Sequence, residues 1–99
     1  MDKEQGHGWR LMEATGQVCD GPARLIRAIL FAAHDGGDCT LYEGTGTDGR
    51  KITQWRSVAN HPHALEFDIR CENGIHYVEG TAVNSCLVIF DPIVEEETD

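Results

Sequence analysis

The sequence predicts an all-β domain, a single antiparallel β-sandwich of six to eight short strands. The clearest strand begins near Ala64, where apolar residues alternate with charged ones as far as Cys71. This period of two is typical of a strand with one buried and one wetted face. Turn signals recur roughly every eight to twelve residues, as in sandwich domains. The alternating residues are Leu65, Phe67, Ile69 and Cys71 on one face and Glu66, Asp68 and Arg70 on the other.

Asn73-Gly74 follows this strand and is a strong turn signal, because both residues tolerate positive φ. We therefore expect residues 75–79 to return as the second strand of a tight hairpin. A two-residue loop would set Asp68 opposite Glu79, which is unfavourable because like charges then face each other; a longer loop or a bulge is the alternative. Residues 86–90 form a continuous apolar run, which predicts a more deeply buried strand.

The stretch 23–34 has two interpretations. Ile26 and Leu30 lie at helical spacing. Pro22 and Gly36 stand where the first turn and the C-cap of a helix would be, which favours a helix. The same stretch is a bulky apolar run suited to a strand covered on both faces. Because the chain downstream consists of strands and turns, a sandwich needs this segment as a central strand, and we predict a strand.

The remaining segments are shorter. Residues 1–8 are polar and form a predicted N-terminal arm, residues 9–92 form the sandwich domain, and residues 93–99 form an acidic tail. Residues 9–19 are a weaker strand candidate, interrupted by Gly16.

Two further strands, at residues 39–43 and 50–55, flank a glycine-rich connection at residues 44–49. Ile52 and Trp55 in the second of these strands have opposite parity. Either both faces of this strand are partly covered, or a β-bulge intervenes.

The charge of the chain excludes some partners. With 8 Lys and Arg against 17 Asp and Glu, the formal net charge is −9, which argues against nucleic acid and anionic membranes as partners. No apolar run approaches the roughly 18 residues of a membrane span. The polar N-terminus has no hydrophobic region behind it, so we expect no signal peptide and folding in a cytoplasm.

In a cytoplasm, the 4 cysteines should remain thiols. None of them lies in a C-x-x-C pair, and their spacing matches no zinc module. Cys39, Cys71 and Cys86 fall within apolar strand patterns, where a thiol behaves as a small hydrophobe. We therefore expect buried structural thiols.

No motif predicts catalysis or a cofactor. His61-Pro62-His63, with His34 or His76, is the nearest approach to a metal site, but a solvated loop is the favoured interpretation. The glycines at 44, 46 and 49 resemble a dinucleotide loop, which would need a helix where residues 50–55 predict a strand. No Ser, Cys or Lys lies in a known nucleophile context, so we predict no enzyme. We also predict no metal, because a solvated histidine loop is the favoured interpretation.

Several short motifs are spread over residues 18–92 and mark turns and core positions. They are Gly21-Pro22-Ala23-Arg24-Leu25, Leu41-Tyr42-Glu43-Gly44-Thr45, Gly49-Arg50-Lys51-Ile52, Phe67-x-Ile69, Gly74-Ile75-x-Tyr77-Val78 and Leu87-Val88-Ile89-Phe90. Together they resemble a group of small bacteriophage virion proteins, in which the Leu-Tyr-acid-Gly-Thr motif begins a flexible hairpin. Trp55, His61-Pro62-His63 and the cysteines depart from that pattern.

The resemblance implies a jelly-roll-like sandwich attached to a virus particle. The expected function is that of a non-enzymatic capsid decoration (cement) protein, which binds the major capsid protein on the outer surface of the virion and forms a homotrimer. A neck, tail or fibre-base adaptor is one alternative, and a soluble cytoplasmic binding module is another. The candidate contact residues are Trp9, Arg10, Thr45, Thr47, Asp48 and Arg50. For Trp9, an ordinary core position is the alternative interpretation.

Overall fold

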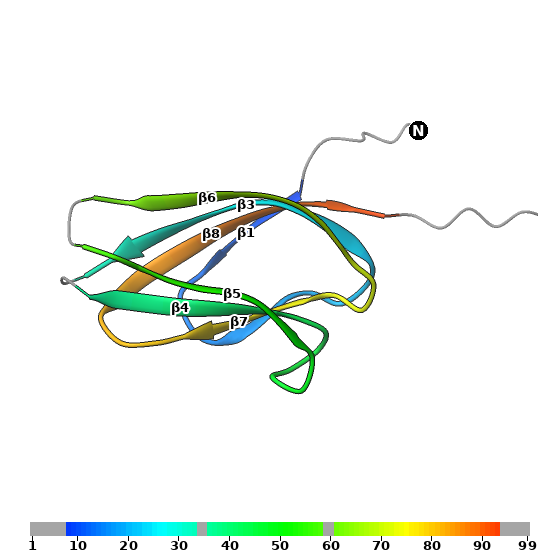
Figure 1. Ribbon diagram of the computed structural model, residues 1–99, viewed down its shortest axis with the longest axis horizontal. Helices are drawn as coiled ribbons and strands as arrows, with labels where there is room; N and C mark the ends of the chain where they lie inside the picture. The colour runs from blue at the N-terminus through cyan, green and yellow to red at the C-terminus, as the bar shows by residue number, and fades with distance from the viewer. Residues whose placement is uncertain (1–7, 34–35, 59–60, 94–99) are drawn as a thin grey trace, which may run out of the picture.

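The computed structural model describes residues 8–33, 36–58 and 61–93, and these residues form eight strands and no helix. The predicted all-β class is therefore confirmed (Figure 1). The part of the chain that is described holds no helix long and apolar enough to cross a membrane. The strands are β1 (Gly8–Met12), β2 (Gly16–Cys19), β3 (Ala23–Ala32), β4 (Gly37–Glu43), β5 (Arg50–Ser57), β6 (His63–Cys71), β7 (Ile75–Glu79) and β8 (Val83–Pro92).

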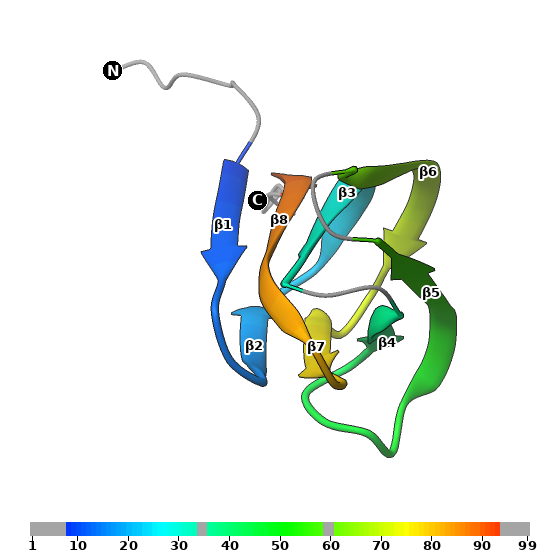
Figure 2. The same ribbon diagram turned by 90° about the vertical axis from the view of Figure 1, so that its left-hand side faces the viewer.

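The strands form two antiparallel four-stranded sheets that pack face to face (Figure 2). Sheet A has the order β1-β8-β3-β6, and sheet B has the order β2-β7-β4-β5. Within these sheets, β4 pairs with β5, β3 with β6, β2 with β7 and β1 with β8. The chain is thus one long antiparallel ribbon curled upon itself, which is the topology of a jelly roll.

The predicted strand at residues 23–34 is confirmed as β3, although its local signals favoured a helix. It lies between β8 and β6, and its buried residues alternate with half-buried ones on either side of a register shift between Leu25 and Arg27. Pairing with two neighbouring strands outweighs the local preference for a helix, because helix propensity contributes only a few tenths of a kcal/mol per residue. His34, the last residue of the predicted stretch, lies outside the described residues.

The predicted hairpin between residues 65–71 and 75–79 is wrong. The first of these segments is β6 of sheet A, whereas the second is β7 of sheet B, so the two strands do not pair. The turn at Glu72-Asn73 carries the chain from one sheet to the other. The unfavourable opposition of Asp68 and Glu79 is thereby avoided.

The predicted strand at residues 9–19 is in fact two strands. β1 and β2 belong to different sheets, and the chain crosses between the sheets at residues 13–15. By contrast, of the two alternatives for the opposite parity of Ile52 and Trp55, the structure shows the bulge. In the β4–β5 pair, Leu41 lies opposite Thr53 and Tyr42 opposite Lys51, so Ile52 is the extra residue.

The core lies between the sheets and includes Leu25, Leu30, Leu41 and Tyr77, all without exposed surface. The predicted buried thiols are confirmed as well. Cys39, Cys71 and Cys86 are fully buried free cysteines, and Cys19 is a half-buried one, with no disulfide among them. Of the predicted arm at residues 1–8, only Gly8 is described, and it is the first residue of β1. Of the predicted tail at residues 93–99, only Ile93 is described.

Candidate interaction surface

Apolar side chains cover part of the outer face of sheet A. Trp9 of β1 lies beside Ile89 of β8, and Leu11 lies beside Leu87. Leu87 in turn lies beside Ile29 of β3, so the rows continue across three strands. On β3 and β8 these side chains alternate with buried ones and therefore point away from the core. We define the apolar face as Trp9, Leu11, Ile29, Phe31, Leu87 and Ile89.

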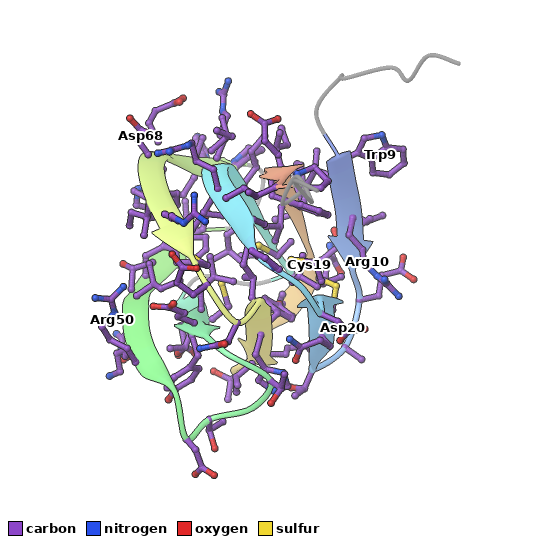
Figure 3. The ribbon with its side chains drawn as sticks, turned by 90° about the vertical axis from the view of Figure 1, so that its right-hand side faces the viewer. Trp9, Arg10, Cys19, Asp20, Arg50 and Asp68 are labelled. Atoms are coloured by element: carbon purple, nitrogen blue, oxygen red, sulfur yellow. The ribbon has the colours of Figure 1, made fainter. Side chains whose placement is uncertain are left out.

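Two members of the apolar face are unusually accessible. Trp9 is 68% exposed and Leu11 is 45% exposed, whereas most large hydrophobic side chains of a domain this size are buried. In Figure 3, Trp9 projects outward from β1, away from both sheets. Trp is enriched among residues that dominate binding energy at protein interfaces. The predicted contact residue Trp9 is therefore a surface side chain, not a core one.

Charged pairs border the apolar face along β3 and β6. Arg24 donates to Asp68 at 2.8 Å, and Arg27 lies 3.2 Å from Glu66. These side chains are 43% to 80% exposed, so each pair contributes little to stability. An apolar centre with a polar, solvated rim is the usual anatomy of a protein–protein interface.

The outer face of sheet B is polar by comparison. Gln17 and His76 are joined by a hydrogen bond of 2.8 Å. Near the other end of the sheet, Asp38 accepts from Thr81 N–H at 3.2 Å and from Gln54 at 3.4 Å. The two sheets thus present different outer surfaces, and the rows of apolar side chains described above lie on sheet A.

The predicted loop at residues 44–49 connects β4 to β5, and hydrogen bonds hold its base. Glu43 Oε1 accepts from Arg50 at 2.7 Å, and Glu43 Oε2 accepts from Glu72 N–H at 2.8 Å. Gly44 N–H donates to Gly74 O at 2.9 Å. An open hollow of about 610 Å³ lies beside the loop and is lined mostly by backbone and polar side chains. Thr45, Thr47 and Asp48 are exposed.

Gln17 fixes the loop further and determines a histidine tautomer. Its Nε2 donates to Gly44 O at 2.7 Å and to Cys19 O at 2.8 Å, so both amide hydrogens are used. The Gln17 oxygen must therefore accept the remaining contact, from Nδ1 of His76 at 2.8 Å. His76 thus carries its hydrogen on Nδ1 and supports the loop.

The predicted contact residues do not form one site. Trp9 and Arg50 lie on opposite sides of the same end of the sandwich (Figure 3). Arg10 pairs with Val88 across β1 and β8, so it has the parity of the inner face, yet it is exposed at the open edge of the sandwich. Only Trp9 belongs to the apolar face; the loop residues and Arg50 form a separate polar surface.

The other members of the apolar face were not predicted, although the sequence held a signal for them. The runs at 23–34 and 86–90 are apolar on both faces and so were expected to be covered on both. A sandwich covers each strand on one face only. The second apolar face of β3 and β8 therefore had to point outward.

The histidine loop lies at the opposite end of the sandwich and is held by backbone contacts. Ser57 donates to His61 O at 2.6 Å, and Trp55 Nε1 donates to His63 O at 3.2 Å. His63 Nδ1 donates to Arg56 O at 2.6 Å. Among the described residues, no three His, Cys, Asp or Glu side chains gather in a way that could hold a metal ion.

Burial makes the thiols of Cys19 and Cys71 poorly reactive. Burial, with a smaller effect of nearby Glu43, raises the pKa of Cys71 to about 11, and burial also raises the pKa of Cys19. Because the thiolate is the reactive form, these thiols are poor nucleophiles near neutral pH.

Neither a protein-family model, nor a curated protein, nor a solved structure matches this chain.

Proposed function

We propose that the chain is a non-enzymatic structural protein of a virus particle, a decoration protein that binds the outer surface of the capsid through the apolar face. The resemblance of its motifs to small bacteriophage virion proteins and its jelly-roll topology support this assignment. The observation that carries it is that the central strands β3 and β8 are apolar on both faces while the sandwich covers only one.

The size of the apolar face fits weak, repeated binding. The three strands that carry the apolar face, about 4.8 Å apart and about 25 Å long, present an outer face on the order of 350 Å². A stable two-protein interface buries about 800 Å² per partner. One copy alone would therefore bind weakly, and several copies joined in an oligomer, as in the expected trimer, would gain avidity.

Binding of this kind would stabilise the shell by mass action. A ligand that binds the mature capsid lattice but not its disassembled subunits shifts the equilibrium toward the lattice. The net charge of −9 would keep many exposed copies soluble. No reaction is required of the chain in this function.

The first test is the amount of the chain in purified virus particles. A decoration protein is present in as many copies as the symmetry-related sites of the shell, whereas a neck or tail adaptor is present in one small ring. Quantitative mass spectrometry against the major capsid protein separates the two. Absence of the chain from particles would refute the virion assignment and favour a cytoplasmic binding module.

The second test places binding on the apolar face. Trp9→Ala and Leu11→Ser should each weaken binding of the purified chain to undecorated shells by about tenfold, because truncating a large apolar residue of an interface costs about 1–2 kcal/mol. Val58→Ala is a control for the loss of an exposed apolar side chain, since Val58 is 43% exposed but is not a member of the apolar face. Unchanged binding of both face variants would exclude this face.

A further inference from the structure

Two cysteines meet in the core from opposite sheets. Cys39 lies on β4 of sheet B and Cys86 lies on β8 of sheet A, and neither has exposed surface. Both belong to the cluster of buried residues that forms the core. A hydrogen bond joins their side chains, so the two sulfur atoms are in contact across the sandwich.

The backbone holds β4 close to β8 beside this pair. Asp38, the residue before Cys39, donates its N–H to Thr81 O at 3.2 Å, and its carbonyl accepts from Gly80 N–H at 2.9 Å. These bonds join β4 to the connection that leads into β8, and Cα atoms of the two strands approach to within 8 Å of each other. A disulfide usually joins residues whose Cα atoms lie about 4.4–6.8 Å apart. The two strands therefore lie near the separation that a disulfide bridges.

The other two cysteines are arranged differently. Cys19 and Cys71 each donate from Sγ to a carbonyl oxygen two residues away in the chain, at 3.9 Å. Their thiols are thus bonded to the backbone of their own segments. The thiols of Cys39 and Cys86 are instead bonded to each other.

The surroundings of the pair slow its reaction. The hydrogen bond with Cys86, and then burial, raise the pKa of Cys39 well above its usual range. Because the thiolate is the reactive form, oxidation of the pair should be slow. A small oxidant such as a peroxide can reach the core when the sheets open locally, whereas a bulky one is hindered.

We propose that Cys39 and Cys86 are the site of an inter-sheet disulfide, which forms when the folded chain meets a peroxide. The peroxide transfers one oxygen to the first sulfur as its O–O bond breaks, which gives a sulfenic acid and one water. The second sulfur then attacks the sulfenic sulfur, the S–S bond forms as the S–O bond breaks, and a second water leaves. Two thiols are thereby oxidised and one peroxide is reduced to two waters.

The bond would lock the two sheets together. It closes a loop of about 50 residues and so restricts the unfolded chain. In a reducing cytoplasm the pair stays as thiols. Under the proposed function, the bond would form after particles leave the cell, but its chemistry does not depend on that function.

The test treats the purified, folded chain with hydrogen peroxide, unfolds it and counts the free thiols by alkylation. Two of the 4 thiols should be protected, and peptide mapping should find Cys39 joined to Cys86. The Tm should rise by about 10 °C or more, and dithiothreitol should reverse both changes. Cys86→Ala should abolish the protection and the rise in Tm. Cys71→Ala, which removes another fully buried thiol, is the matched control and should keep both.

Other results would overturn the proposal. Complete alkylation of the oxidised chain, or sulfinic acids at residues 39 and 86 without a cross-link, would show that the pair cannot close. A bond that maps to Cys19 and Cys71, or that joins two chains, would assign the oxidation to another site. The mapping uses the wild-type chain, so it decides even where a variant fails to fold. Binding of the reduced chain to undecorated shells tests the proposed function separately, so the two can fail independently.

Discussion

At the scale of single residues, the core contains a polar group without a partner. Tyr77 is fully buried, and its hydroxyl makes no hydrogen bond within the described structure. Burial, and then the neighbouring Cys39, raise the pKa of Tyr77 well above its usual range. A buried hydroxyl without a partner costs about 1–3 kcal/mol of desolvation. The ring of Tyr77 stabilises the core while its oxygen does not.

Tyr77→Phe should therefore raise the free energy of unfolding by about 1 kcal/mol, because the ring stays and the unpaired hydroxyl is removed. Urea unfolding followed by intrinsic fluorescence measures this. Tyr77→Ala, which removes the ring as well, should lower the free energy of unfolding by about 3–5 kcal/mol. A loss of stability in the Phe variant would mean that the hydroxyl has a partner.

At the scale of elements, the turn at residues 72–74 shows what the local sequence can specify and what it cannot. Asn73-Gly74 specifies a sharp change of direction, which the structure has. It does not specify whether the two flanking strands pair, because that depends on β3 and β4, which are distant in sequence and compete for the same edges. The opposition of Asp68 and Glu79 was the one sequence signal against the hairpin.

The same reasoning explains what could be predicted of the fold and of the site. Alternation depends on one strand alone, so β6 was predictable from its own residues, whereas β3 was predictable only from the strands that follow it in the chain. The apolar face joins β1, β8 and β3, and its rows exist only once the register is known. Trp9 was identified as a contact residue from its type and its place at the end of the polar arm, whereas its neighbours on the apolar face could not be identified in this way.

The turn also makes a prediction about Gly74. Its φ is +104°, and a Cβ there would lie 2.5 Å from Cys19 O, where β2 ends. Gly74→Ala should lower the free energy of unfolding by about 2–4 kcal/mol, from backbone strain and the steric clash together. Gly21→Ala is the control: no atom lies within 4 Å of its Cβ position, so the change should stay within about 0.5 kcal/mol. Equal effects in chemical denaturation would contradict this account.

At the scale of the whole molecule, both ends of the sandwich are fastened by bonds between connections and strands. At the end opposite the 44–49 loop, Asp38 of β4 contacts the connection that leads from β7 into β8. Gly80 N–H donates to Asp38 O at 2.9 Å, and Thr81 N–H donates to the Asp38 carboxylate at 3.2 Å. Because this connection passes from sheet B to sheet A, the charge of Asp38 helps to hold the two sheets together.

This contact makes stability depend on pH. The Thr81 N–H lowers the pKa of Asp38, so the folded state holds the ionised form more strongly than the unfolded state, in which the pKa is about 3.9. The contribution is fully present above that value and is lost as the pH falls through the lower folded pKa.

Asp38→Asn should therefore be less stable than the wild type at neutral pH, by less than about 1 kcal/mol because the carboxylate is partly exposed, and this gap should close as the pH falls below about 4. Urea unfolding at a series of pH values measures the gap. A gap for Asp38→Asn that stays constant into acid would mean that its hydrogen bonds, and not its charge, hold the β7–β8 connection.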